Sequence, residues 1–210
     1  MIGKIFVTSS GYDPEKGKDV KDPYLGPTPS LGACRPDIRR QLQTGDHIFV
    51  VSGKVPGVNQ FVIGGFEIAE KISPIEAYRR FPEQRLKMGD GDQVTGNVVV
   101  NAAGKQHKLD HHKKETFARR IENYVVGCKP IALVTPEEIA EGRRRTLDIL
   151  RDVFGVEGDS IRELMGRNRN MTEKQVRKLR EHMDALKKLA RLRTPMELIR
   201  GLSTVARVAV

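Results

Sequence analysis

Cysteine, tryptophan and long apolar runs are scarce or absent in this chain. Its 210 residues contain only two cysteines, Cys34 and Cys128, which are too few for a disulfide framework, so we expect reduced thiols and a cytoplasmic protein. No stretch of about 18 consecutive apolar residues occurs, and the first residues, MIGKIFVT, lack the long apolar segment of a signal peptide. We therefore expect neither a membrane span nor secretion.

Acidic residues are outnumbered by basic ones. The chain carries 37 lysines and arginines against 27 aspartates and glutamates, which gives a formal net charge of +10. An excess of positive charge favours polyanionic partners, because each neutralised phosphate releases counterions. Binding of nucleic acid or nucleotides is therefore the first hypothesis, and a merely solubilising surface is the alternative.

The first 130 residues have the pattern of short strands separated by turns. Runs of β-branched and aromatic residues predict strands at 4–8, 47–52, 60–70, 97–100 and 121–126, the last of them ending at Gly127. Two glycines inside the third run predict a bend or bulge, as found where a sheet closes into a barrel. The sheet is therefore expected to be strongly curved.

Loops and short helices connect these predicted strands. Residues 11–32 are rich in Gly, Pro and Asp, and a loop of this length is usually functional or mobile. Pro36 at a first helical position predicts a helix over 36–42, and Ser73-Pro74-Ile75-Glu76 predicts another that ends near Phe81.

From Thr135 onward the apolar spacing changes to that of helices. The capping-box pattern Thr135-Pro136-Glu137-Glu138 predicts a helix to about Phe154. A short helix is predicted from Asp159, a long one from Thr172, and a last one from the capping pattern at Thr194. On the long helix, five apolar residues spaced by three and four form one stripe: Val176, Leu179, Met183, Leu186 and Ala190.

These patterns predict an α+β fold with a small β-barrel over residues 1–130 and a helical C-terminal subdomain over 131–210. We expect the stripe to be buried, either against the barrel or in a homodimer formed through the C-terminal helices. Residues 159–165, the turn at 166–170 and the helix after it also have the outline of a helix-turn-helix, although the second helix is longer than recognition helices usually are.

The most informative stretch is LGACRPDIRR, Leu31–Arg40, followed by Gly45–Gly53. Arg35 and Arg39 have the i to i+4 spacing that places two guanidinium groups side by side on a helix, an arrangement suited to a phosphate. In the alternative interpretation, one arginine pairs with Asp37 or Asp46 and the others are solvated.

The same residues carry a resemblance to a known family. Leu31–Arg40, the Gly-Asp turn that opens Gly45–Gly53, and a second Gly-Asp segment, Gly89–Val94, resemble the nucleotide-modification-associated domains found in phage and bacterial gene neighbourhoods for altered DNA bases. The Gly-Asp turn before a long strand, and the Gly-Gly-Phe-Glu-Ile strand after it, are also similar to PUA-like barrels, which include the ASCH, EVE and YTH groups. Over residues 1–130, the resemblance implies a small, partly closed barrel that holds a nucleotide or an extruded base in a cleft.

The sequence departs from these families in two respects. Arg35 stands where a lysine is expected, and the helices after Thr135 have no counterpart in the resemblance. The chain has four tyrosines, seven phenylalanines and no tryptophan. With so few aromatic residues, we expect a base to stack on one ring or on an arginine rather than in a full aromatic cage.

If the barrel binds a nucleotide, we expect seven residues to line one of its mouths: Ser9, Ser10, Tyr12, Cys34, Arg35, Ser52 and Lys54. Arg39 and Arg40 would contact phosphates, and Arg35 would share that phosphate-contacting edge. For Ser52 the alternative is a turn hydroxyl that bonds the backbone, and for Cys34 it is a small buried apolar residue with no partner base.

Two groups of residues have partial catalytic or metal-binding patterns. His107, Asp110, His111 and His112, with distant Cys128, have some metal-ligand spacing, but the neighbouring lysines oppose a cation, and a solvated basic loop over 105–120 accounts for them better. Asp46, Glu67 and the adjacent Glu70 and Lys71 do not fit a metal nuclease, since adjacent strand residues point to opposite faces.

The sequence contains no Walker loop, no Gly-x-Ser-x-Gly elbow and no His-Glu-x-x-His motif. We therefore predict a binding protein for nucleic acid or modified nucleotides, linked to DNA base modification in phage or bacteria. We predict no catalytic residues, no metal and no cofactor. The alternatives are a nucleotide-modifying or nucleotide-cleaving enzyme, and an accessory protein that acts through its C-terminal helices.

Overall fold

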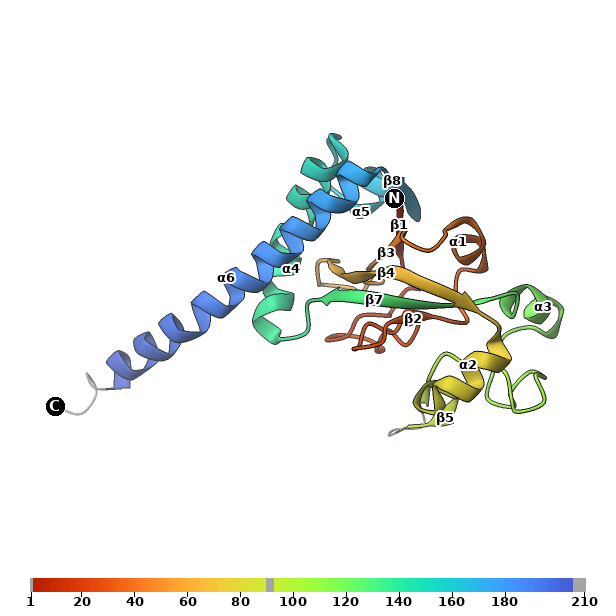
Figure 1. The fold of residues 1–210 in the computed structure, drawn as a ribbon. Coiled ribbons are helices and arrows are strands. Elements are labelled where there is room, and N and C mark those ends of the chain that lie inside the picture. The colour runs from red at the N-terminus through yellow and green to blue at the C-terminus, as the bar shows by residue number, and fades with distance from the viewer. Residues whose placement is uncertain (1, 90–92, 206–210) are drawn as a thin grey trace.

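The computed structural model of the protein describes residues 2–89 and 93–205, with side chains described as far as Leu192. Its fold is mixed α+β, with a curled, six-stranded half-barrel sheet and several helices (Figure 1). The strand order of this sheet is β2-β7-β4-β3-β1-β8. Two further strands of two residues each, β5 (Lys87–Met88) and β6 (Val94–Thr95), pair with each other in a separate sheet. The predicted α+β class is thus confirmed.

Three predicted strands form the centre of the sheet. β1 (Gly3–Val7) pairs in parallel with β3 (His47–Val51), and β3 pairs antiparallel with β4 (Val62–Ile72). The ladder between β4 and the next strand, β7, is irregular between Gly65 and Glu67, which confirms the bend predicted at the two glycines. All five residues of β3 are buried, in accordance with its apolar sequence.

The other predicted strands need correction. β7 spans Tyr124–Ala132, so it begins later than predicted and continues through Gly127. A Cβ at this glycine would lie 2.1 Å from Cδ2 of Phe66, so the glycine permits close packing inside the strand and does not end it. Residues 97–100 make only isolated bridges, although their valines are buried.

Neither the short pair β5 and β6 nor two strands of the six-stranded sheet were predicted. β2 (Ser30–Leu31) pairs with β7 at one edge of the sheet, and β8 (Asn168–Met171) pairs with β1 at the other. Because β8 occupies the turn of the supposed helix-turn-helix, that outline is wrong. The predicted boundary between residues 130 and 131 falls within β7. The division of the chain into two domains stays a prediction.

Two of the predicted helix starts are confirmed by their caps. α2 (Pro74–Arg80) has Ser73 as its N-cap, and α4 (Pro136–Phe154) begins with the complete capping box of Thr135 and Glu138. α4 ends at Gly155, whose left-handed backbone (φ +63°) suits a residue without a side chain. The remaining short elements are α1 (Pro36–Gln41), η1 (Pro82–Gln84), β5 (Lys87–Met88), β6 (Val94–Thr95), η3 (Lys114–Thr116), α3 (Phe117–Arg120) and α5 (Ile161–Met165).

The last helix, α6 (Glu173–Val205), is longer than predicted. It is one continuous helix where the sequence predicted two, so the capping pattern at Thr194 lies inside it and starts no new helix. In Figure 1, α6 runs along α4 and then projects away from the sheet. Of the residues that the structure describes, none belongs to a helix that is both long enough and apolar enough to cross a membrane.

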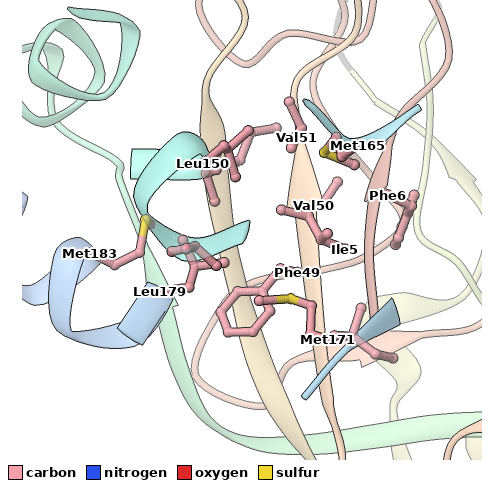
Figure 2. Packing of buried hydrophobic residues seen from close by; sticks show 14 of the residues in the cluster. Ile5, Phe6, Phe49, Val50, Val51, Leu150, Met165, Met171, Leu179 and Met183 are labelled. Carbon is pink, nitrogen blue, oxygen red and sulfur yellow. The ribbon is translucent and has the colours of Figure 1, made fainter. Parts of the chain in front are cut away.

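The apolar stripe of α6 is buried within the chain. Val176, Leu179, Met183, Leu186 and Ala190 are each at most 2% exposed. Figure 2 shows Leu179 and Met183 near Leu150 of α4, facing the strands that carry Ile5 and Phe49. The prediction of burial is confirmed, and the stripe packs on the sheet, so it provides no seam for a second subunit.

The helices α4 and α6 and the segment before α1 lie on opposite faces of β1. A Cβ at Gly3 would meet Val176 of α6 at 2.6 Å, which places alternate residues of β1 on the α6 side. The intervening residues face α1, because Lys4 Nζ bonds Gln41 and the Phe6 ring lies 5.2 Å from the Arg35 guanidinium carbon. This second face leads to the candidate site.

Candidate functional site

A cavity of about 470 Å³ opens at the C-terminal end of β1. Its wall comes from three parts of the chain: residues 6–12 and 21–22, residues 34–35 before α1, and residues 86–120. One group of lining residues is apolar: Phe6, Val7, Leu86, Val94, Val99 and Leu109. A second group is basic: Lys21, Arg35, Arg120, His111 and His112. The carboxyl groups of Asp22 and Asp110 also line the wall, so the cavity combines apolar contact with three cationic side chains, those of Lys21, Arg35 and Arg120, and two carboxyl groups.

Lys21 is an ammonium without a partner. Over 2–89 and 93–205 the structure gives its Nζ no hydrogen bond and no ion pair, although the residue is half-buried in the cavity wall. Burial, with the charge of Lys18, lowers the pKa of Lys21, because both disfavour the protonated form. A bound anion would relieve this cost, so Lys21 is a candidate anion contact in the cavity.

Arg35 is fixed in the wall by its neighbours. It occupies a left-handed backbone conformation (φ +50°) before α1, and its Nε and Nη2 donate to Asp37 at 3.0 and 2.6 Å. The Arg35 guanidinium lowers the pKa of Asp37 to about 2. The pairing with Asp37 confirms the alternative interpretation for this arginine, and its side chain still lines the cavity above Phe6.

Arg120 is a site residue that the sequence analysis did not single out. Its Nη1 donates to the carbonyl of Ala33 at 3.0 Å, a contact across 87 positions of sequence. It lies at the end of the basic loop predicted over 105–120, and only the fold brings it to Arg35. The loop's charge was visible in the sequence, but the direction of this side chain was not.

Asp22 was also missed, and it shapes the wall. Its carboxylate accepts hydrogen bonds from the backbone N–H groups of Gly32, Ala33 and Cys34 and from Asn97 Nδ2. Burial raises the pKa of Asp22, while these donors oppose the shift. The carboxylate thus holds the turn that presents Arg35 to the cavity.

A third missed feature anchors the long loop over the cavity. Asp13 is fully buried, and its carboxylate accepts hydrogen bonds from Arg143 of α4 at 2.7 and 2.9 Å. The Arg143 guanidinium also lies 4.7 Å from the centre of the Phe61 ring. The side-chain bonds from Arg143 lower the pKa of Asp13 although burial acts to raise it. The loop that carries Tyr12 and Lys21 is therefore bound to the helical part.

His112 is held in the wall by a buried carboxylate. Its Nδ1 lies 2.5 Å from Oδ1 of Asp110, whose Oδ2 accepts a hydrogen bond from Gln106 at 2.9 Å. Burial acts to raise the pKa of Asp110, but the bonds from His112 and Gln106 outweigh it and keep the pKa below its usual value. The Asp110 carboxylate is therefore charged at neutral pH.

Four of the nine predicted binding residues line the cavity. Ser9, Tyr12, Cys34 and Arg35 come together there. Ser10 and Lys54 lie outside the lining, where Ser10 Oγ donates to the Lys54 carbonyl at 3.1 Å.

Arg39 is the main correction to the predicted site. It is fully buried, and its guanidinium donates to the carbonyls of Cys34, Arg120 and Asn123. It therefore cannot contact phosphate at the surface. The argument from the i to i+4 spacing is also wrong, because Arg35 is the left-handed N-cap residue and lies outside the helix, while α1 turns Arg39 inward.

Arg40 and Ser52 also lie away from the cavity. Arg40 is exposed and pairs with Glu122 at 3.3 Å. Ser52 is fully buried, and its hydroxyl accepts a hydrogen bond from the N–H of Phe61 at 3.0 Å. The Ser52 hydroxyl thus bonds the backbone, as in the alternative interpretation, although its partner is on a different segment of the chain.

The Cys34 thiol is expected to react slowly in the native protein. Burial, with the nearby charge of Asp22, raises the pKa of the Cys34 thiol, so the thiolate is scarce at neutral pH. We expect iodoacetamide at pH 7.5 to leave Cys34 unmodified in the folded protein and to alkylate it in urea. Peptide mass spectrometry checks this result, and fast native alkylation of Cys34 would contradict it.

The three acidic groups considered as metal ligands bond other parts of the chain. Asp46 accepts backbone hydrogen bonds from Ile2 and Gln43, while Glu67 pairs with Lys129 and Glu70 with Arg80. Across the described ranges 2–89 and 93–205, no three His, Cys, Asp or Glu side chains are grouped so as to hold a metal ion.

Comparisons with protein-family models, with curated proteins and with solved structures give no match for this chain. The resemblance to the nucleotide-modification-associated domains and to PUA-like barrels stays a prediction, and the geometry of the cavity carries the functional argument.

Proposed function

We propose that the protein binds nucleic acid by taking one nucleotide, plain or modified, into the cavity of a PUA-like barrel. The observation that carries the proposal is the composition of the cavity wall, which combines apolar side chains with Lys21, Arg35 and Arg120. A nucleotide has the same two parts, a planar base and an anionic phosphate. A cavity of about 470 Å³ falls within the range of small-molecule sites.

The roles of the basic residues follow from their freedom to bind. Lys21 has no partner in the described part of the chain and would take a phosphate oxygen directly. Arg35 already stacks on Phe6, and its guanidinium plane would give a base a second surface. Arg120 bonds Thr116 and Ala33 through Nε and Nη1, and its Nη2, which has no hydrogen-bond partner within 2–89 and 93–205, would meet the ligand.

The rest of the molecule supports binding to a polymer. A net charge of +10 favours a polyanion and gives an affinity that falls with salt. The curled half-barrel is the architecture that the PUA-like resemblance implies, and modified DNA bases are the ligands that the resemblance to nucleotide-modification-associated domains suggests. A panel of plain and modified single-stranded DNA and RNA oligonucleotides, measured by fluorescence anisotropy, tests which nucleotide is preferred.

The sharpest test of the cavity is Lys21→Ala. We expect the variant to lose about 1–3 kcal/mol of binding free energy, because a charge-assisted bond to phosphate is lost, and to reduce the salt slope by about one. The measurement is anisotropy with one oligonucleotide at several salt concentrations.

Lys54→Ala is the matched control, since Lys54 is exposed and lies outside the cavity lining. Loss of one positive charge is the same in both variants, so their difference reports the cavity. Equal affinities for the two variants would contradict the proposal.

A further inference from the structure

One pair of side chains in the cavity wall has the arrangement used for proton transfer. The Asp110 side chain is 2% exposed and bonds Nδ1 of His112, whose own side chain is 33% exposed and lines the cavity. A carboxylate on Nδ1 fixes the ring and its tautomer, which leaves Nε2 as a proton acceptor. Nε2 of His112 has no hydrogen-bond partner within 2–89 and 93–205.

The surroundings of His112 suit a reaction at phosphorus. Lys21, Arg35 and Arg120 line the same cavity, and fixed cations stabilise the negative charge that develops on phosphoryl oxygens. No hydroxyl or thiol of the described residues is hydrogen-bonded to His112, and the Cys34 thiol stays protonated. A substrate that carries its own nucleophile fits this wall, and in RNA a 2′-hydroxyl lies next to each phosphodiester.

We propose that the cavity cleaves RNA by transesterification with His112 as the catalytic base, an inference that rests on the proposed binding function. His112 Nε2 removes the proton of a 2′-hydroxyl, the O2′–P bond forms and the P–O5′ bond breaks. The leaving 5′ oxygen takes a proton from His111, the second imidazole of the wall. The products are a 2′,3′-cyclic phosphate and a 5′-hydroxyl, and no oxidant or reductant is consumed.

The test compares one RNA oligonucleotide with a DNA oligonucleotide of the same sequence, both in EDTA with excess protein. We expect both to bind and only the RNA to be cleaved, with cyclic phosphate ends identified by mass spectrometry. His112→Asn should lower the single-turnover rate constant by about 100-fold or more, because general base catalysis contributes that much, while binding of the DNA is retained.

His182→Asn is the matched control. Its imidazole also bonds a carboxylate, that of Asp152 at 2.6 Å, and is likewise 33% exposed, but it lies between α4 and α6. This variant should cleave at the rate of the unaltered protein. A trace nuclease carried through purification would be equal in both variants and would show no difference.

Asp110 is a positioning residue for His112 in this reaction. Asp110→Asn should lower the single-turnover rate constant while the affinity for DNA and the melting temperature are retained. A purely structural role would lower the affinity and the melting temperature together. His112→Gln repeats the main test if His112→Asn does not fold.

The outcomes separate the inference from the proposal beneath it. Binding of both oligonucleotides without cleavage would overturn RNA cleavage and leave the binding function standing. Failure to bind either one would overturn both. Cleavage that persists in the His112 variants at the original rate would remove His112 from the reaction.

Discussion

Replacing Arg39 with alanine is expected to lower the free energy of unfolding by about 3–5 kcal/mol, the usual cost of removing one partner from a buried charged network. The guanidinium is fully buried and joins the turn at 33–35 to residues 120–123. Without it, these carbonyl groups lose their donors and the buried Asp22 loses a nearby positive charge. Urea unfolding followed by circular dichroism measures the change.

Arg40→Ala is the control for Arg39, one position along the same helix. Arg40 is exposed and makes a surface pair with Glu122, so its loss should change stability by less than about 1 kcal/mol. Arg39→Lys should also destabilise the protein, because a single ammonium cannot reach carbonyls on both sides as the guanidinium does. Equal stabilities of the Arg39→Ala and Arg40→Ala variants would contradict the structural role of Arg39.

The contrast between these arginines shows what the sequence could and could not predict. The helix over 36–42, its proline start and the basic cluster were all evident from local pattern. Which arginine faces solvent depends on the sheet beneath α1, where Ile38 and Leu42 are buried together with Arg39. Helical spacing places side chains relative to each other, but tertiary packing decides which of them meets the ligand.

The cavity itself is a long-range construction. Arg120 and Ala33 are 87 positions apart, and Asn97 reaches Asp22 across 75 positions. Local periodicity contains no information on such pairs, so the residues of the wall after 86 were seen only as a basic loop. Strand β8 (Asn168–Met171) was not predicted for a related reason. Its polar sequence has little strand propensity, and its conformation depends on pairing with β1.

The helical part was predicted more accurately because its signals are local. The caps at Thr135 and Ser160 and the stripe on α6 each depend on residues a few positions apart. The contacts of these helices with distant parts of the chain could not be predicted from local patterns. Arg143 of α4 binds Asp13 across 130 positions, so the helices hold the loop that carries Lys21 over the cavity.

Leu179→Asp is expected to unfold the helical part of the molecule. Leu179 of α6 is fully buried against α4 and the sheet. An aspartate there would remove the apolar contacts of the leucine and would bury a carboxylate without its water. The loss should exceed about 4 kcal/mol, whereas Leu179→Ala should cost about 2–5 kcal/mol and stay measurable. Thermal unfolding and urea titration of both variants give these values.

Leu192→Asp and Leu192→Ala are the matched controls on the same helix. The Leu192 side chain is 68% exposed, beyond the packed stripe, so both changes should lie within about 0.5 kcal/mol of the unaltered protein. Size-exclusion chromatography of the Leu192 variants also reports whether this end of α6 contributes to self-association, because a homodimer held there would dissociate in Leu192→Asp. If Leu179→Asp kept the stability of the unaltered protein while Leu192→Asp lost it, the burial of the stripe within the chain would be wrong and α6 would pack by its other end.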